Sequence, residues 1–87
     1  MGGTEMTEEE RQSKLVSLAS RKQMAEKAYD GMYEAHSPHD ANACYRDAKE
    51  HFYDAMTLAR ELGMMNELDA LNQRLLHIKA VFRSQFA

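Results

Sequence analysis

The spacing of apolar residues along the first part of the chain predicts one long helix. Apolar residues recur there every three or four positions, which places them on one side of a helix. They are Leu15, Leu18, Ala25, Ala28, Tyr29, Met32, Tyr33 and Ala35. Just before them, Thr7 and Glu10 have the spacing of a capping box, in which each side chain accepts a hydrogen bond from the backbone of the other residue. We therefore expect a first helix from about Glu8 to Ala35.

Two further helices follow, and each has its own start signal. Ser37 suits a helix N-cap, and Pro38 suits the first helical position, where its missing N–H costs nothing. A stripe of small and aromatic residues with heptad-like spacing then leads to Gly63, a residue typical of a left-handed C-cap. Asn66, with Asp69 three residues later, marks a third start ahead of a leucine-rich stripe. The second helix is thus expected at about 38–62 and the third from Asn66 onwards.

The lengths of the connections predict how these helices are arranged. Helices joined by a few residues pack antiparallel. We therefore expect an all-α fold, an up-down-up antiparallel three-helix array, either as a bundle or as a helical hairpin plus one helix. Residues 1–6 show no apolar period and are expected to form a disordered N-terminal tail. Residues 7–87 then make a single three-helix domain.

Composition narrows the classes of function. Hydrophobic residues make up 44% of the chain and charged residues 29%, which fits a folded soluble domain. The net charge of −3 argues against nucleic acid as a partner. No apolar run approaches the ~20 residues of a membrane span, so we expect no membrane contact. The single cysteine excludes an internal disulfide framework and a cysteine-based zinc site, and we expect a cytoplasmic location.

Few residues are candidates for chemistry. The sequence contains no glycine-rich phosphate loop and no motif of a serine hydrolase or zinc protease, so we expect no enzymatic activity, no catalytic residue and no cofactor. The alternative function rests on histidine. Antiparallel packing places residues of the second and third helices whose numbers add up to ~129 at one level, and this puts His51 level with His77. A domain that senses a metal or small ligand through these two side chains still lacks a third ligand. Cys44 lies on the apolar stripe and is expected to be a buried structural thiol.

Several apolar residues have no obvious place in the core. The chain has seven methionines, and methionine is frequent at adaptable binding surfaces. Met64 and Met65 lie in the second turn, Tyr53 lies on the outer side of the second helix, and Leu76 lies off the main stripe of the third. These four residues are therefore predicted to contact a partner.

A difference in helix length predicts a second contact region. The first helix should be ~42 Å long and the third ~30 Å, so the N-terminal turns of the first helix are expected to project beyond the others. We expect these turns to leave Leu15, Val16 and Leu18 uncovered. Uncovered leucines favour docking by a second copy or by another protein.

The second helix also resembles a known repeat family. Ala48, Phe52 and Ala55, followed by Leu62 and Gly63, are similar to the second helix of a tetratricopeptide repeat. The resemblance covers ~16 residues of one half-repeat. It implies a helical-hairpin scaffold whose groove binds a peptide or a partner helix, and it assigns no binding residues.

Together these features predict a small helical protein–protein interaction module, adaptor, chaperone-like or regulatory, with no catalytic activity. Its partner is expected to be another protein or a second copy of the chain in a homodimer. The predicted contact residues are Leu15, Leu18, Tyr53, Met64, Met65 and Leu76.

Overall fold

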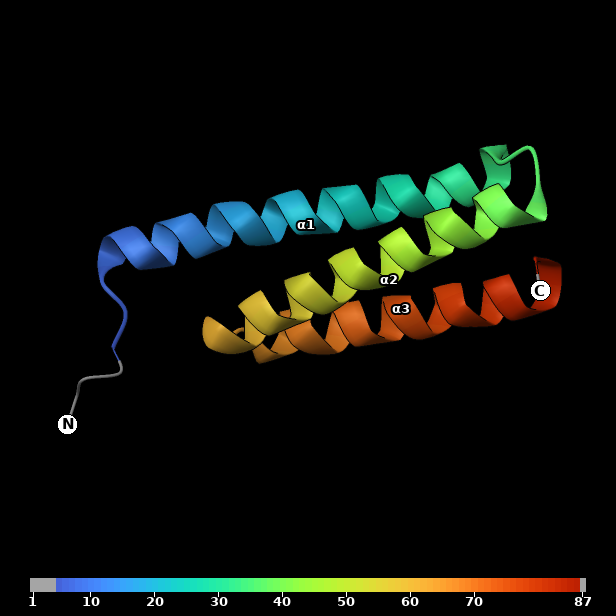
Figure 1. Cartoon of the computed structure of the whole chain (residues 1–87). Helices are drawn as coiled ribbons and strands as arrows, with labels where there is room; N and C mark the ends of the chain where they lie inside the picture. The colour runs from blue at the N-terminus through green and yellow to red at the C-terminus, as the bar shows by residue number, and fades with distance from the viewer. Residues whose placement is uncertain (1–4, 87) are drawn as a thin grey trace.

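Three α-helices make up the fold (Figure 1). The computed structural model describes residues 5–86. Helix α1 spans Glu8–Glu34, α2 spans Pro38–Glu61 and α3 spans Met65–Gln85. In Figure 1, α1 and α3 run in one direction and α2 returns between them. This confirms the all-α, up-down-up three-helix array.

The predicted start signals of the first two helices are confirmed. At the start of α1, the Thr7 hydroxyl accepts from the Glu10 N–H at 3.1 Å, and the Glu10 carboxylate accepts from the Thr7 N–H at 2.9 Å. At the start of α2, the Ser37 hydroxyl accepts from the Asp40 N–H at 3.1 Å, with Pro38 in the first turn. These bonds satisfy backbone donors that have no partner inside a helix.

The turn between α2 and α3 forms a Schellman motif. Gly63 has a φ of 71°, and its N–H donates to the carbonyl of Arg60 at 3.0 Å, while the Met64 N–H donates to the carbonyl of Ala59 at 2.9 Å. The Met64 side chain packs against the core, as the residue after the left-handed glycine commonly does. Helix α3 therefore begins at Met65, and the predicted N-cap at Asn66 is wrong.

Small residues bring α1 and α2 close together. Ala48, Ala55 and Ala59 of α2 are fully buried, and α1 and α2 pack against each other more closely than either packs against α3. At Gly31 of α1 little space remains, because a methyl group added there would stand 3.0 Å from the sulfur of Cys44. Cys44 is half-buried and free, so the predicted buried thiol is only partly covered.

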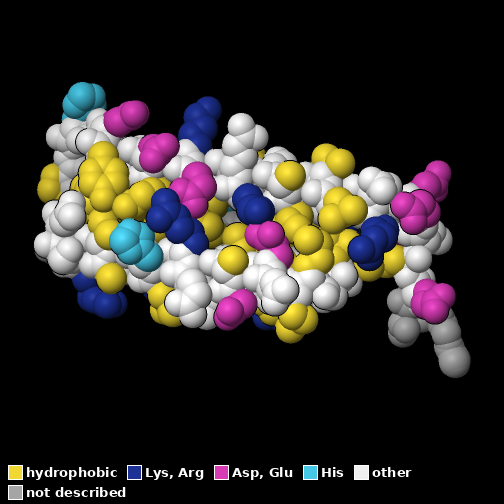
Figure 2. Space-filling model, turned by 180° about the vertical axis from the view of Figure 1, so that it is seen from behind, with side chains coloured by type: hydrophobic (Ala, Val, Ile, Leu, Met, Phe, Trp, Pro, Cys, Tyr) yellow, Lys and Arg dark blue, Asp and Glu magenta, His cyan; other side chains and the backbone are white. Residues whose placement is uncertain are grey.

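Helix α3 reaches α1 mainly through side chains. Arg74 donates two hydrogen bonds of 2.8 Å to the carboxylate of Glu26, and Lys22 pairs with Glu67 at 2.8 Å. Phe52 of α2 is almost completely buried and lies below these two ion pairs, at the base of a small cleft between α1 and α3. Seen from behind, the molecule shows acidic and basic side chains next to one another along the middle of this face (Figure 2).

An aromatic cluster closes the end of the molecule where α3 ends. Tyr45 of α2 stacks on Phe82 of α3 with ring centroids 3.9 Å apart. Phe86 then packs edge-on against Tyr33 of α1 at 5.3 Å. The expected tail at 1–6 falls mainly on residues 1–4, which lie outside the described residues, but Met6 is described and packs against the core.

Candidate functional site

Two ion pairs show which residues of α1 and α2 lie at the same level. Lys14 pairs with Glu61 at 3.0 Å and Arg21 pairs with Asp54 at 3.7 Å, and in both pairs the residue numbers add up to 75. The last residue of α2 is therefore level with Lys14. Only the turns of α1 before Lys14 project beyond the other helices (Figure 1).

This register overturns the expected exposure of Leu15 and Leu18. The projecting residues of α1, at positions 8–13, are all polar. Leu18 is 4% exposed, and Leu15 is half-buried against the core, because α2 and its neighbours extend to this level. The prediction that the projecting turns leave these two leucines uncovered is wrong. Val16, on the other side of α1, is 69% exposed.

The remaining predicted contact residues lie on α2, on α3 and in the turn between them. Tyr53 is 47% exposed, Met65 60% and Leu76 51%. Met65 and Leu76 are eleven residues apart, which places them on the same side of α3 three turns from each other. Met64 is half-buried and packs against the core, so it supports the turn and offers little surface.

A surface groove of about 450 Å³ runs between α2 and α3 next to these exposed residues. It is lined by Met56 and Arg60 from α2 and by Met65, Leu68, Asp69 and Asn72 from α3. Half of the lining is apolar, from Met56, Met65 and Leu68, and half is polar, from the basic Arg60, the acidic Asp69 and the amide Asn72. We call this groove, together with Lys49, Tyr53, Leu76 and Lys79, the hairpin face.

Lysine side chains extend the hairpin face beyond the groove. Lys79 of α3 donates a hydrogen bond of 2.9 Å to the Tyr53 hydroxyl. Lys49 of α2 lies 4.6 Å from the centre of the Tyr45 ring. Lys79 was not among the predicted contact residues, although it lies three residues after Leu76, close to the same side of α3.

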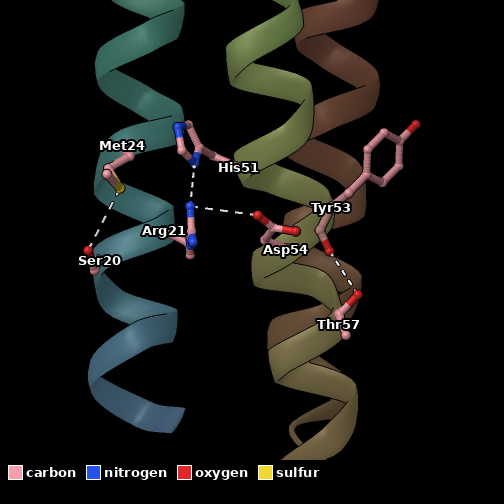
Figure 3. Close-up of polar contacts among 7 residues, drawn as sticks. All are labelled: Ser20, Arg21, Met24, His51, Tyr53, Asp54 and Thr57. Atoms are coloured by element: carbon pink, nitrogen blue, oxygen red, sulfur yellow. Dashed lines mark hydrogen bonds and ion pairs between the residues drawn. The ribbon is translucent and has the colours of Figure 1, made fainter. Parts of the chain in front are cut away.

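Two acidic residues of α2, Asp54 and Glu61, point to α1 and away from the hairpin face. Figure 3 shows Arg21 of α1 between His51 and Asp54, while the Tyr53 ring points away from them. Glu61 likewise faces α1, where it pairs with Lys14. Acidic and basic residues that alternate along the sequence of α2 are thus separated in space, with the carboxylates of Asp54 and Glu61 on the α1 side.

The two histidines at one level have different surroundings. The α2–α3 register agrees with the prediction, but the His51 ring turns to α1, where Nδ1 lies 3.2 Å from the Arg21 guanidinium. Arginine can only donate, so the His51 nitrogen is the acceptor in this contact. His77 is exposed on α3. Within residues 5–86, no group of three or more His, Cys, Asp or Glu side chains is arranged to hold a metal ion.

The cleft between α1 and α3 is smaller than the groove of the hairpin face, and two ion pairs join the two helices across it. It has a volume of about 210 Å³, and the Glu26–Arg74 and Lys22–Glu67 pairs line it. Hydrogen bonding to Arg74 lowers the pKa of the Glu26 carboxyl, and the same contact raises the pKa of Arg74. Because these side chains already satisfy each other, the cleft offers fewer free groups to a ligand than the hairpin face does.

Comparison with known proteins finds no relative. No family model matches the chain, and no curated protein or solved structure is significantly similar to it. In the part of the chain that the structure describes, no helix is long and apolar enough to cross a membrane.

Proposed function

We propose that this protein is a small helical protein-interaction module that acts by binding and not by catalysis, and that its contact surface is the hairpin face. The observation that supports this most directly is the exposure of Tyr53, Met65 and Leu76 beside a groove whose lining is half apolar. Exposed apolar groups gathered around a groove are typical of binding surfaces. An adaptor, chaperone-like or regulatory role in the cytoplasm fits such a module.

The shape of the groove favours a helical partner. Two antiparallel helices form its walls, and an amphipathic helix inserts its apolar side into such a groove. The resemblance of Ala48, Phe52 and Ala55 to a tetratricopeptide-repeat helix is consistent with this mode of binding. The partner is another protein or a second copy of the chain.

The first test measures the mass of the protein in solution by light scattering over a range of concentrations. The variant Met65→Ser/Leu76→Ser removes apolar surface from the hairpin face, and Val16→Ser is the matched control because Val16 is even more exposed but lies on α1. If the chain self-associates, the double variant should be a monomer at concentrations where the control still associates. Circular dichroism should show unchanged helicity in both variants.

If the chain is a monomer, a photo-crosslinking residue at position 76 replaces the mass measurement. It should capture a protein from extracts of the source cells, and the same group at position 16 should not. A chain that neither self-associates through the hairpin face nor crosslinks preferentially from position 76 would overturn the proposed function.

A further inference from the structure

We propose that the hairpin face binds an acidic amphipathic helix of another protein, with carboxylates three turns apart and two apolar residues between them. This inference rests on the proposed function and specifies the partner. It follows from the order of charged and apolar residues on α2, from the ion pairs that α2 makes with α1, and from the groove beside α3.

The outer side of α2 carries a regular pattern of four residues. Lys49, Tyr53, Met56 and Arg60 are separated by four, three and four positions, which places them in one stripe along the helix. The two cations are at the ends of the stripe, ~16 Å apart, and the two apolar side chains lie between them. Met56 and Arg60 line the groove, and Tyr53 contacts Lys79 of α3.

Within the described part of the chain, the cations of this stripe form no ion pair. Among residues 5–86, neither Lys49 nor Arg60 has a carboxylate oxygen within 4.0 Å, and the same holds for Lys79. All four ion pairs of the described residues involve α1 instead. The chain has a net charge of −3, but its hairpin face contains three cations, Lys49, Arg60 and Lys79, and one acidic residue, Asp69. A negatively charged partner complements this face.

Apolar residues between the cations favour a protein over a nucleic acid. Tyr53, Met56 and Leu76 provide hydrophobic surface between the levels of Lys49 and Arg60, and we expect an apolar side chain of the partner to bury it. A nucleic-acid backbone, by contrast, is bound by clustered cations on a basic domain. The combination of separated cations and central apolar residues therefore matches an acidic amphipathic helix.

The stripe on α2 specifies the partner's own pattern. A helix lying along the groove meets Lys49 and Arg60 with side chains at positions i and i+11, which lie on one side of a helix three turns apart. Positions i+4 and i+7 lie between them and face the apolar residues. The expected pattern is thus acidic at i and i+11 and apolar at i+4 and i+7. The pattern reads the same in both directions, so it does not select the orientation of the partner helix.

A display library tests this pattern with the full chain as bait. Each displayed helix carries leucine or methionine at i+4 and i+7, and glutamate, lysine, glutamine or alanine at i and i+11. We expect selection to enrich glutamate over lysine at both outer positions by about tenfold. Fluorescence anisotropy of a selected peptide should show binding that weakens severalfold from ~50 mM to ~500 mM salt, because rim charges are screened.

Charge reversal on the hairpin face provides the specific variant. Lys49→Glu/Arg60→Glu should shift the preference from glutamate to lysine at the outer positions. Arg11→Glu/Lys27→Glu is the matched control, since it changes the net charge equally and its side chains are exposed on α1. The control should keep the glutamate preference, and circular dichroism should show that both variants remain helical. The salt dependence of the unaltered chain tests the inference even if the variant loses helicity.

Several results would overturn this inference. They are enrichment of lysine, no charge preference, an equal effect of the control reversal, tighter binding of a single-stranded oligonucleotide than of the selected peptide, and self-association through the hairpin face. If position 76 still crosslinks to a protein while the library shows no preference for glutamate, the acidic partner is wrong and the proposed function stands. If position 76 captures nothing and the chain stays a monomer, both fail.

Discussion

The close approach of α1 and α2 at Gly31 leads to a prediction whose sign depends on one neighbour. Gly31 lies in the last turn of α1, and replacing a helical glycine by alanine stabilises a protein by ~0.5–1 kcal/mol, because glycine loses more backbone entropy on folding. At Gly31 the new methyl group would stand 3.0 Å from the Cys44 sulfur. Overpacking of this kind destabilises a protein by ~1–3 kcal/mol. Because the Cys44 side chain is only half-buried, it can shift away from the new methyl group, and we expect a cost near the lower end of this range.

The two effects therefore nearly cancel in the unaltered background. We expect Gly31→Ala alone to change the free energy of unfolding by between about zero and a loss of ~1 kcal/mol. In a Cys44→Ala background the sulfur is gone, and the nearest remaining atom of residue 44, Cβ, is 3.8 Å away, an ordinary contact distance. There Gly31→Ala should stabilise the protein by ~0.5–1 kcal/mol, so the two substitutions should be coupled by ~1–2 kcal/mol.

Urea unfolding of the four proteins of this cycle, followed by circular dichroism, measures the coupling directly. Equal stabilisation by Gly31→Ala in both backgrounds would refute the reasoning, because it would mean that α1 and α2 do not approach each other at this position. The result also bears on the contact surface, since the same register covers Leu15 and Leu18 and leaves the hairpin face as the candidate site.

Three further predictions concern other parts of the fold. Glu26→Gln should remove a contribution of ~0.5 kcal/mol that the partly exposed Glu26–Arg74 ion pair makes to stability. Because Arg74 lowers the pKa of Glu26, that contribution is present above the ordinary carboxyl pKa and is lost as the pH falls through the lowered pKa. Urea unfolding at ~pH 6 and ~pH 3 should therefore show that the variant loses less stability on acidification than the unaltered chain does. Gly63→Ala should destabilise the protein by ~1–2 kcal/mol although the space around it is open, because its φ of 71° strains any residue with a Cβ; unchanged stability in urea would contradict the Schellman turn. Phe52→Ala should cost ~3–5 kcal/mol in thermal or urea unfolding, since the side chain is almost fully buried among all three helices, and a cost below ~1 kcal/mol would show that this centre is not packed.

Local signals in the sequence were sufficient for the helices and for most of their ends. The capping box of Thr7 and Glu10, the N-cap Ser37 and the left-handed Gly63 each act within four residues. Such signals predict structure well because the atoms that interact are neighbours in the chain. The start of α3 was the exception, because burial of Met64 against the core outweighed the capping preference of Asn66.

The candidate site depended on contacts between residues far apart in the chain. The exposure of Tyr53, Met65 and Leu76 could be predicted from their positions on two helices. The hydrogen bond between Lys79 and Tyr53 could not, because it joins two different helices. The level of His51 and His77 followed from the length of the turn, whereas the direction of the His51 ring depended on Arg21 of another helix. Residues at one level can still point to different neighbours.

The sequence by itself thus determined the number of helices, their order and the alternation of apolar residues that forms the core. Only the tertiary structure decided the register of α1 on α2, which buried Leu18 and left polar turns projecting. It also decided which charges pair, so that Asp54 and Glu61 pair with α1 and not with Lys49, Arg60 or Lys79 of the hairpin face. The physical reason is that register and charge pairing are set by the combined packing of small residues, core side chains and ion pairs on separate helices, and no short stretch of sequence contains that information.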